Sequence, residues 1–221
     1  MDDAWTSGQA YESYMGRWSR LVAAELVARL ALPGGLRWLD VGCGTGALTR
    51  AVLTAAAPAA VVGVDPSEPF VRAAAGLADP PAHFVVGRAE RLPVADAAVD
   101  VAVSGLVLNF VPDRPAAAAE LHRVLRPGAT VAAYVWDYAG GMQLLAGFWR
   151  AAAAVDPRAA ALDEGPRFAG FGHDALHELL TGAGFADVQV DAVVIPVVFA
   201  DQDELWAPFL RGSGPAPAYV A

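Results

Sequence analysis

Three glycines and two aspartates stand where one ligand could meet all of them. Gly42, Gly44 and Gly46 follow a short apolar run, and an amphipathic helical pattern begins directly after them. Asp40 precedes the first glycine by two residues, and Asp65 ends the next apolar run. Glycines let a ligand lie against bare backbone, over the partly positive end of the following helix. A carboxylate at the end of a second strand can accept hydrogen bonds from both hydroxyls of a ribose. The residues therefore predict a site for a nucleoside-containing ligand.

Three hypotheses fit this pattern. Gly42-x-Gly44-x-x-Ala47 satisfies the dinucleotide fingerprint, which favours an NAD(P)-dependent oxidoreductase. Asp40 favours another ligand, because a carboxylate repels a pyrophosphate and attracts an ammonium group. The third hypothesis is a chain that keeps the fold without turnover, since fold alone does not imply function.

The glycine turn needs a strand before it and a helix after it, which is the opening unit of a doubly wound sheet. Apolar, β-branched runs predict six strands, at 37–41, 61–65, 83–86, 99–104, 130–136 and 187–198. Apolar residues at helical spacing predict helices at 17–31, from 67 onward, at 115–125, 174–181 and 203–210. We therefore predict an α/β fold with a doubly wound, mostly parallel sheet.

Length and composition narrow the class of protein. The 221 residues fit one α/β domain, and 56% hydrophobic content excludes a largely disordered chain. A net charge of −9 without any basic run argues against a nucleic-acid partner. The single cysteine, Cys43, rules out an internal disulfide and a cysteine metal cluster, and no metal site is expected. No apolar run is long enough to span a bilayer, so we expect a soluble, cytoplasmic protein without a membrane partner.

Several stretches within 36–136 resemble the class I S-adenosylmethionine-dependent methyltransferases. Residues 39–46, Leu-Asp-Val-Gly-Cys-Gly-Thr-Gly, are similar to motif I of that family. Residues 87–93 resemble its Gly-Asp-Ala-Glu-x-Leu-Pro signature, except that Arg88 stands where an acidic residue or Asn usually reads the adenine amino group. An Arg cannot accept that hydrogen bond, but it could stack on the ring. Residues 104–113 resemble the loop after strand four in small-molecule and quinone-type members.

The resemblance implies S-adenosyl-L-methionine as the cofactor and a Rossmann-like methyltransferase fold. It also implies a set of cofactor-binding residues: Arg17, Asp40, Gly42, Gly44, Thr45, Asp65, Pro66, Ser67, Arg88, Ala89, Glu90 and Ser104. Asn109 matches a position that is often His or Asn in the family, and it could equally be a helix cap.

We expect one domain over residues 1–221. Its expected reaction is the transfer of a methyl group to a small-molecule acceptor by direct displacement. Residues 1–31 form an N-terminal lid and helix, and residues 36–136 form the cofactor-binding core. Residues 138–185 form a substrate-side insertion with a helix, and residues 186–221 form a C-terminal strand and tail. Aromatic side chains of the lid and insertion should line the acceptor pocket: Tyr14, Trp18, Trp136, Tyr138, Phe148 and Trp149. No catalytic residue can be assigned; a general base is needed only for an acceptor that must lose a proton, and His173 and Asp137 are weak candidates.

Members of this family usually complete a seven-stranded sheet, with the last strand antiparallel. Two prolines and two glycines follow Leu210, which argues against a buried strand there. We therefore expect a sheet without its seventh strand. Exposed strand edges favour association, so a homodimer is a further expectation.

Overall fold

The computed structural model describes residues 15–76, 80–138, 140–211 and 214–221. The chain divides into two compact units, each with its own core. Unit 1 comprises the segment up to Ser19 together with Trp136–Gly172 and Val194–Ala221. Unit 2 comprises Arg20–Val135 and His173–Val193.

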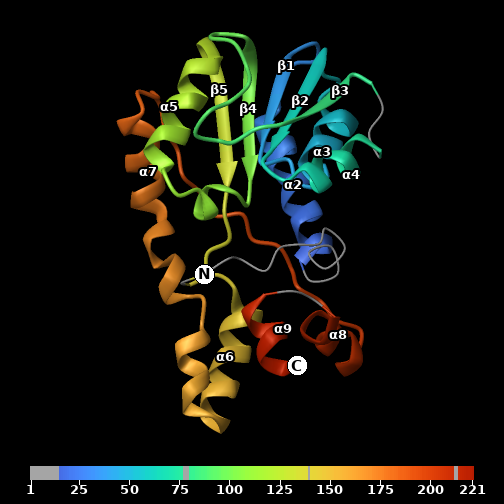
Figure 1. Ribbon diagram of the computed structural model, residues 1–221, viewed down its shortest axis with the longest axis vertical. Helices are drawn as coiled ribbons and strands as arrows, with labels where there is room; N and C mark the ends of the chain where they lie inside the picture. The colour runs from blue at the N-terminus through green and yellow to red at the C-terminus, as the bar shows by residue number, and fades with distance from the viewer. Residues whose placement is uncertain (1–14, 77–79, 139, 212–213) are drawn as a thin grey trace. The chain divides into compact units, whose positions relative to one another are not determined.

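Unit 2 contains a five-stranded sheet in the order β3-β2-β1-β4-β5 (Figure 1). All four pairings between neighbouring strands are parallel. The strands are β1 (Arg37–Val41), β2 (Ala60–Asp65), β3 (Ala82–Val86), β4 (Val99–Gly105) and β5 (Leu125–Tyr134). Parallel strands end at the same edge of a sheet, so the residues that follow β1, β2, β3 and β4 meet along one edge.

Helices cover both faces of this sheet, as the doubly wound prediction requires (Figure 1). They are α2 (Arg17–Leu30, which begins in unit 1), α3 (Ala47–Ala55), α4 (Glu68–Ala75), η2 (Leu108–Phe110), α5 (Arg114–Val124) and α7 (His173–Gly182). Alternate residues of β1 face opposite sides. Trp38 packs in a core cluster with residues of α2 and α3, and Leu39 and Val41 pack in a second cluster with residues of α5. The side chain of Asp40 therefore points to the face covered by α2 and α3.

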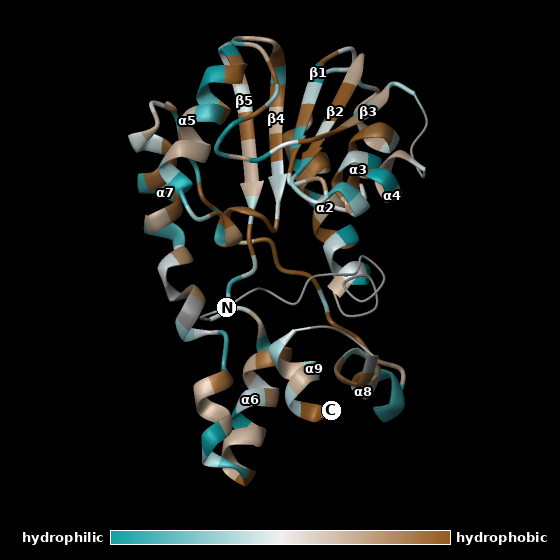
Figure 2. Cartoon of the chain, viewed as in Figure 1, coloured by the Kyte–Doolittle hydropathy of each residue, from teal (hydrophilic) through white to brown (hydrophobic). Residues whose placement is uncertain are grey.

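The sixth strand predicted at 187–198 is wrong: the structure gives these residues no strand. The segment is strongly hydrophobic, as the brown coil between α7 and α8 shows (Figure 2). A hydrophobic, β-branched sequence does not by itself produce a strand, because a strand forms only by hydrogen bonding to a neighbouring strand. No antiparallel seventh strand forms among the described residues, which confirms that prediction and leaves a sixth strand without a neighbour. Pro196 also lacks the N–H that pairing requires.

Unit 1 is helical. It contains α6 (Gln143–Val155), η3 (Pro157–Leu162), η4 (Pro166–Phe171), α8 (Gln202–Arg211) and α9 (Pro215–Val220). Its core is an apolar cluster built from Met15, Trp18, Leu145, Trp149, Ala159, Phe209 and Ala216. The tail after Leu210, with its two prolines and two glycines, forms no strand among the described residues and contains the helix α9. Pro215 is a favourable first residue for a helix, because its fixed φ suits the first turn and its missing N–H has no helical partner there.

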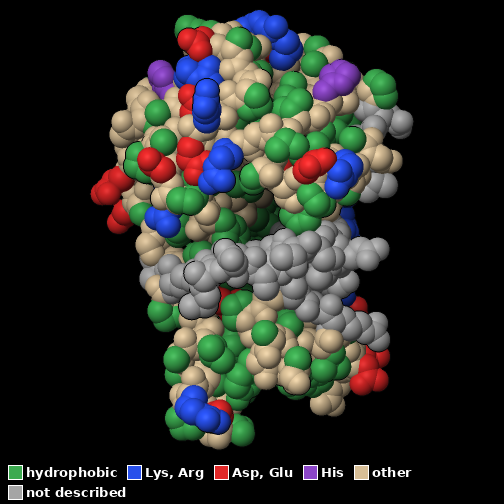
Figure 3. Space-filling view, viewed as in Figure 1, with side chains coloured by type: hydrophobic (Ala, Val, Ile, Leu, Met, Phe, Trp, Pro, Cys, Tyr) green, Lys and Arg blue, Asp and Glu red, His purple; other side chains and the backbone are tan. Residues whose placement is uncertain are grey.

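Acidic and basic side chains are interspersed on the face of unit 2 that Figure 3 shows. Several form ion pairs, including Arg123 with Asp96 at 2.6 Å and Arg126 with Asp100 at 2.6 Å. Among the helices that the structure describes, none combines the length and apolar character needed to cross a membrane.

Candidate functional site

The glycine turn lies at the end of β1 and opens α3. Gly42, Gly44 and Gly46 all have positive φ, at 74°, 52° and 86°, which other residues adopt only at a cost. A Cβ at Gly42 would lie 2.2 Å from a methyl carbon of Val107, so this glycine is required by packing. A Cβ at Gly44 would have no described heavy atom within 4 Å beyond its chain neighbours. Gly44 is thus the position where bare backbone faces open space.

The N–H groups of Gly42, Cys43 and Gly44 are already bonded within the protein. Gly42 and Cys43 both donate to the Val64 carbonyl, at 2.7 and 3.1 Å. Gly44 donates to Asp65 Oδ2 at 2.9 Å. A pyrophosphate site needs such N–H groups to point at the ligand. The turn therefore disfavours the dinucleotide hypothesis.

Asp65, at the end of β2, ties the turn to the neighbouring strand. Its Oδ2 accepts from Gly44 N–H and its Oδ1 accepts from Ser67 N–H at 2.8 Å. Each carboxylate oxygen has a second lone-pair site, so both can accept from a ligand hydroxyl as well. Burial raises the pKa of Asp65, and the two backbone donors oppose that effect. The predicted ribose site is therefore compatible with the observed bonds.

Asp40 is fully buried in β1 and has one unpartnered oxygen. Its Oδ2 accepts from the Thr49 hydroxyl at 2.6 Å, whereas its Oδ1 has no partner among the described residues. Burial raises the pKa of Asp40 to about 6, and the nearby Asp65 adds to that effect. Neither carboxylate forms an ion pair with a described residue. Two close carboxylates without a counter-cation favour a cationic ligand.

The raised pKa predicts how stability depends on pH. The folded protein binds a proton at Asp40 up to about pH 6, whereas the unfolded chain releases it near 3.8, so this group lowers stability as pH rises through that window. Asp40→Asn keeps an acceptor for Thr49 and cannot ionise. We expect the variant to be roughly 2–3 kcal/mol more stable than wild type at pH 7.5 and similar to it near pH 4. Urea unfolding from pH 4 to 8 measures the difference, and a gap independent of pH would contradict the assignment.

Cys43 is buried beside these carboxylates and is not available as a nucleophile. Burial first, and then the charges of Asp40 and Asp65, raise the pKa of its thiol far above neutral pH. Nucleophilic cysteine chemistry needs the thiolate. Covalent catalysis at this residue is therefore disfavoured.

The loop after β3 passes next to Asp65, because Gly87 N–H donates to the Asp65 carbonyl at 3.1 Å. Arg88 points its exposed side chain toward Glu90, with 3.5 Å between their nearest charged atoms. Ala89 packs against the core. These residues therefore lie beside the predicted ribose site, where a nucleobase would continue.

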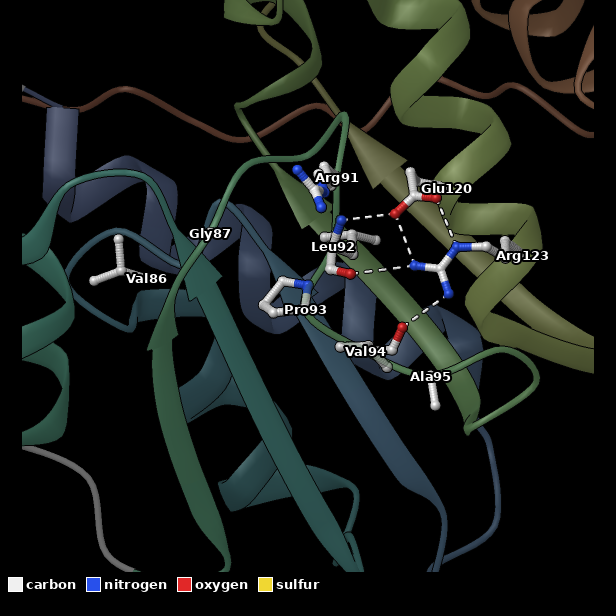
Figure 4. A pocket seen from close by; sticks show the side chains of 9 residues that line it. All are labelled: Val86, Gly87, Arg91, Leu92, Pro93, Val94, Ala95, Glu120 and Arg123. Carbon is white, nitrogen blue, oxygen red and sulfur yellow. Dashed lines mark hydrogen bonds and ion pairs between the residues drawn. The ribbon is translucent and has the colours of Figure 1, made fainter.

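A part-buried network of hydrogen bonds and ion pairs connects this loop to α5 (Figure 4). Arg123 donates to the carbonyls of Val94 and Leu92 at 2.8 and 3.2 Å, and Glu120 accepts from Leu92 N–H at 2.7 Å. The mutual hydrogen bonds lower the pKa of Glu120 and raise the pKa of Arg123. These charge-assisted hydrogen bonds hold the loop after β3 in place against α5.

A cavity of about 670 Å³ lies against this network, between the loop and α5. Its lining residues are Val86, Gly87, Arg91, Leu92, Pro93, Val94, Ala95, Glu120 and Arg123 (Figure 4). None of the residues at the glycine turn lines it. The cavity is therefore separate from the glycine turn, although Gly87, which bonds the Asp65 carbonyl, is one of its lining residues.

Two of the three other predicted site residues, Ser104 and Thr45, have contacts within the protein. The Ser104 hydroxyl is buried and donates to the Val41 carbonyl at 2.9 Å, which links β4 to β1. Thr45 follows Gly44 in the turn, and its carbonyl accepts from Arg50 at 3.5 Å. Pro66 is exposed between Asp65 and Ser67. A cofactor contact by Ser104, Thr45 or Pro66 stays a prediction.

Arg17 belongs to unit 1, and its side chain is engaged there. Its guanidinium bonds Glu204 at 2.6 Å and the Val198 carbonyl at 2.9 Å, and it lies over the ring of Phe199 at 5.0 Å. The carboxylates of Asp40 and Asp65 lie in unit 2. The contact between Arg17 and the cofactor stays a prediction.

The two weak candidates for a base lie in different units. His173 is exposed at the start of α7, with its Nδ1 3.1 Å from Asp174. Asp137 accepts from Gly140 N–H at 2.9 Å, which stabilises the turn before α6. A catalytic role for either stays a prediction.

Two of the aromatic residues nominated for the acceptor pocket are core residues. Trp18 and Trp149 are 3% and 2% exposed within the core of unit 1. Trp149 also donates to the buried Glu164 at 2.7 Å, and Phe148 stacks on Phe209 with ring centres 4.6 Å apart. Tyr14 lies outside the described residues. The side chains of Trp18 and Trp149 therefore pack in the core of unit 1.

The residues present fit S-adenosylmethionine. The unpartnered oxygen of Asp40, the open space over Gly44 and the adjacent Asp65 provide an anionic, bare-backbone edge for a cationic nucleoside. Sequence reasoning missed two supporting residues, Thr49 and Val107. Only the spacing of Thr49, nine residues after Asp40 on the helix behind the turn, could have indicated its role.

Residues 39–133 match the model of a family described as methyltransferase domain. A malonyl-[acyl-carrier protein] O-methyltransferase from Pseudescherichia vulneris is 35% identical over 152 residues, which is 69% of this chain and 57% of that protein. A 2-methyl-6-phytyl-1,4-hydroquinone methyltransferase from Synechocystis is 30% identical over 189 residues, 83% of this chain and 57% of that protein. A demethylmenaquinone methyltransferase from Roseiflexus is 41% identical over 110 residues, 49% of this chain and 46% of that protein. The chain thus spans about half the length of these curated relatives.

Solved structures show the same fold. A protein from Haloferax volcanii, solved with a methyltransferase activator, superposes with a TM-score of 0.61 at 22% identity, over 92% of this chain and 87% of that one. An S-adenosylmethionine-dependent methyltransferase from Thermotoga maritima superposes with a TM-score of 0.57 at 22% identity, over 81% of this chain and 76% of that one.

Proposed function

We propose that this chain, whose residues 39–133 match the methyltransferase-domain model, transfers a methyl group from S-adenosylmethionine to a small-molecule acceptor. The fold that it shares with an S-adenosylmethionine-dependent methyltransferase from Thermotoga maritima supports the proposal. The observation that carries the proposal is the pair of carboxylates, Asp40 and Asp65, flanking the open backbone at Gly44. When bound, S-adenosylmethionine supplies an electrophilic methyl group that the acceptor takes by direct displacement.

The chain's own residues hold and orient the cofactor. Asp40 Oδ1 attracts the ammonium group, and Asp65 accepts from the ribose hydroxyls while keeping Gly44 in place. Positioning of this kind can supply about 7–11 kcal/mol of the barrier. The loop at 87–90 lies where the nucleobase continues, with Arg88 available to stack on it and backbone groups of Ala89 available to read its edge.

The acceptor is proposed only as a class. The curated relatives are named as methyltransferases of malonyl-[acyl-carrier protein], of demethylmenaquinone and of 2-methyl-6-phytyl-1,4-hydroquinone. Incubation with methyl-labelled S-adenosylmethionine and a malonyl thioester, a reduced quinone or an amine tests the class directly. We expect label in one acceptor with wild type, and much less label with Asp65→Ala at a cofactor concentration that does not saturate the variant. Cofactor binding without transfer, to these acceptors or to any compound in a cell extract, would favour the non-catalytic homologue.

Homodimer formation and a cytoplasmic location belong to the same proposal. In unit 2, β3 and β5 are the edge strands of the sheet, and edges of this kind can pair with a second chain. Sedimentation equilibrium measures the association. A monomer at all concentrations would remove the dimer from the account and leave the cofactor site intact.

A further inference from the structure

Asn109 is a buried amide without a partner. Its side chain lies in η2 and is 6% exposed, and neither Nδ2 nor Oδ1 bonds any described residue. Buried polar groups are paired in the large majority of cases, and each unpaired one costs about 1–3 kcal/mol. An unpaired buried group in a folded protein calls for an explanation, and a contact with a ligand is one.

The helix-cap interpretation of Asn109 is wrong. The residue that caps α5 is Asp113, which accepts from Ala116 N–H at 3.0 Å. The residue before η2 is Val107, and no side chain caps that turn. The side-chain amide of Asn109 therefore caps neither η2 nor α5.

The loop that carries Asn109 lies against the glycine turn. It follows β4, the neighbour of β1 in the sheet, and the side chain of Val107 fills the space beside Gly42. Leu106 turns the chain with a φ of 63°, a conformation that costs a leucine about 1–2 kcal/mol. Strain of this kind is concentrated at binding and catalytic sites.

Two unpartnered buried groups therefore belong to neighbouring parts of the fold: Asp40 Oδ1 lies in β1, and the Asn109 amide lies in η2, in the loop that follows the adjacent strand β4. Asp40 offers acceptors only, whereas an amide offers donors and an acceptor on one side chain. The amino-acid end of S-adenosylmethionine carries an ammonium group, which needs acceptors, and a carboxylate, which needs donors.

We propose that Asn109 binds the amino-acid end of the cofactor, with Nδ2–H donating to its carboxylate and Oδ1 accepting from its ammonium group beside Asp40. This inference rests on the proposed function. It gives unit 2 a donor for the cofactor carboxylate that does not depend on Arg17.

The test compares two ligands that differ only at that end. S-adenosylhomocysteine has the amino-acid end, and 5′-methylthioadenosine has the same nucleoside and thioether without it. Asn109→Leu keeps a branched side chain of four heavy atoms and removes the amide. Calorimetry should show S-adenosylhomocysteine binding weakened about 10- to 100-fold, and 5′-methylthioadenosine binding changed less than about threefold.

The melting temperature of the ligand-free protein provides a second readout. Removing two unsatisfied polar atoms should leave it unchanged or raise it, whereas loss of a structural amide would lower it. Gln189→Leu, at an exposed amide of the same unit, is the control and should change neither affinity. Asn109→Ala serves with the same readouts if the leucine variant does not fold.

Equal weakening of both ligands, an unchanged affinity for S-adenosylhomocysteine, or a lower melting temperature without a ligand-specific effect would overturn the inference. If wild type binds neither ligand, the proposed function fails instead, so the two failures are distinguishable.

Discussion

Replacing Asp65 by alanine should weaken S-adenosylhomocysteine binding about 30- to 1000-fold, the range for charge-assisted hydrogen bonds. The substitution removes the acceptors for the ribose hydroxyls. It also releases Gly44 N–H and Ser67 N–H, which the carboxylate holds at 2.9 and 2.8 Å. The glycine turn and the start of α4 therefore lose their common anchor. Isothermal titration calorimetry measures the change.

Asp100→Ala is the matched control. Asp100 is a carboxylate near the opposite end of the sheet, bonded to Arg126 and to Arg37 N–H. Its loss should cost stability without changing cofactor affinity by more than about twofold, since exposed ion pairs contribute about 0–1 kcal/mol. If Asp65→Ala binds as tightly as Asp100→Ala, the ribose site has been misplaced.

Gly44→Val should reduce cofactor affinity at least about 100-fold, while the protein remains folded. A Cβ at Gly44 would meet no described heavy atom within 4 Å beyond its chain neighbours, so the valine side chain would extend into the space assigned to the ligand. The positive φ of 52° adds a backbone cost of about 1–2 kcal/mol. Thermal unfolding and calorimetry on the same preparation separate the two effects.

Gly128→Val reproduces the backbone cost away from the site. Gly128 also has a positive φ, 77°, and a Cβ at this position would meet no described heavy atom within 4 Å beyond its chain neighbours. It lies in the exposed first residues of β5. We expect a similar loss of stability with unchanged affinity. Equal affinities in the two variants would reject the argument from bare backbone at Gly44.

The strand and helix pattern around the glycine turn could be predicted because it is local. The apolar run of β1, the three glycines and the amphipathic α3 follow one another within 19 residues, Arg37–Ala55. Asp40 and Asp65 were placed correctly at the ends of β1 and β2, since parallel strands bring their carboxyl ends to one edge.

The contacts that shape the site could not be predicted, because they join positions far apart in the sequence. Asp65 bonds Gly44 across 21 positions, and Val107 fills the space beside Gly42 from a different strand end. The residue types at positions 44, 65 and 107 gave no indication of either contact. The same reason explains Arg17, whose partner Glu204 lies 187 positions away.

The predicted sixth strand was wrong for a different reason. The β-branched residues of 187–198 favour a strand. A strand also needs a neighbouring strand to pair with, and the described residues do not provide one for this segment. Edge and terminal strands are therefore less predictable than β1, which pairs on both sides.

The central claim is that the edge formed by Asp40, Gly44 and Asp65 binds a nucleoside that carries an ammonium group and does not bind a dinucleotide. Titration calorimetry of the wild-type protein with S-adenosylhomocysteine and, separately, with NAD⁺ tests it most directly. The account predicts saturable binding of S-adenosylhomocysteine with one site per chain and no heat of binding for NAD⁺. Binding of NAD⁺ in preference to S-adenosylhomocysteine would contradict it.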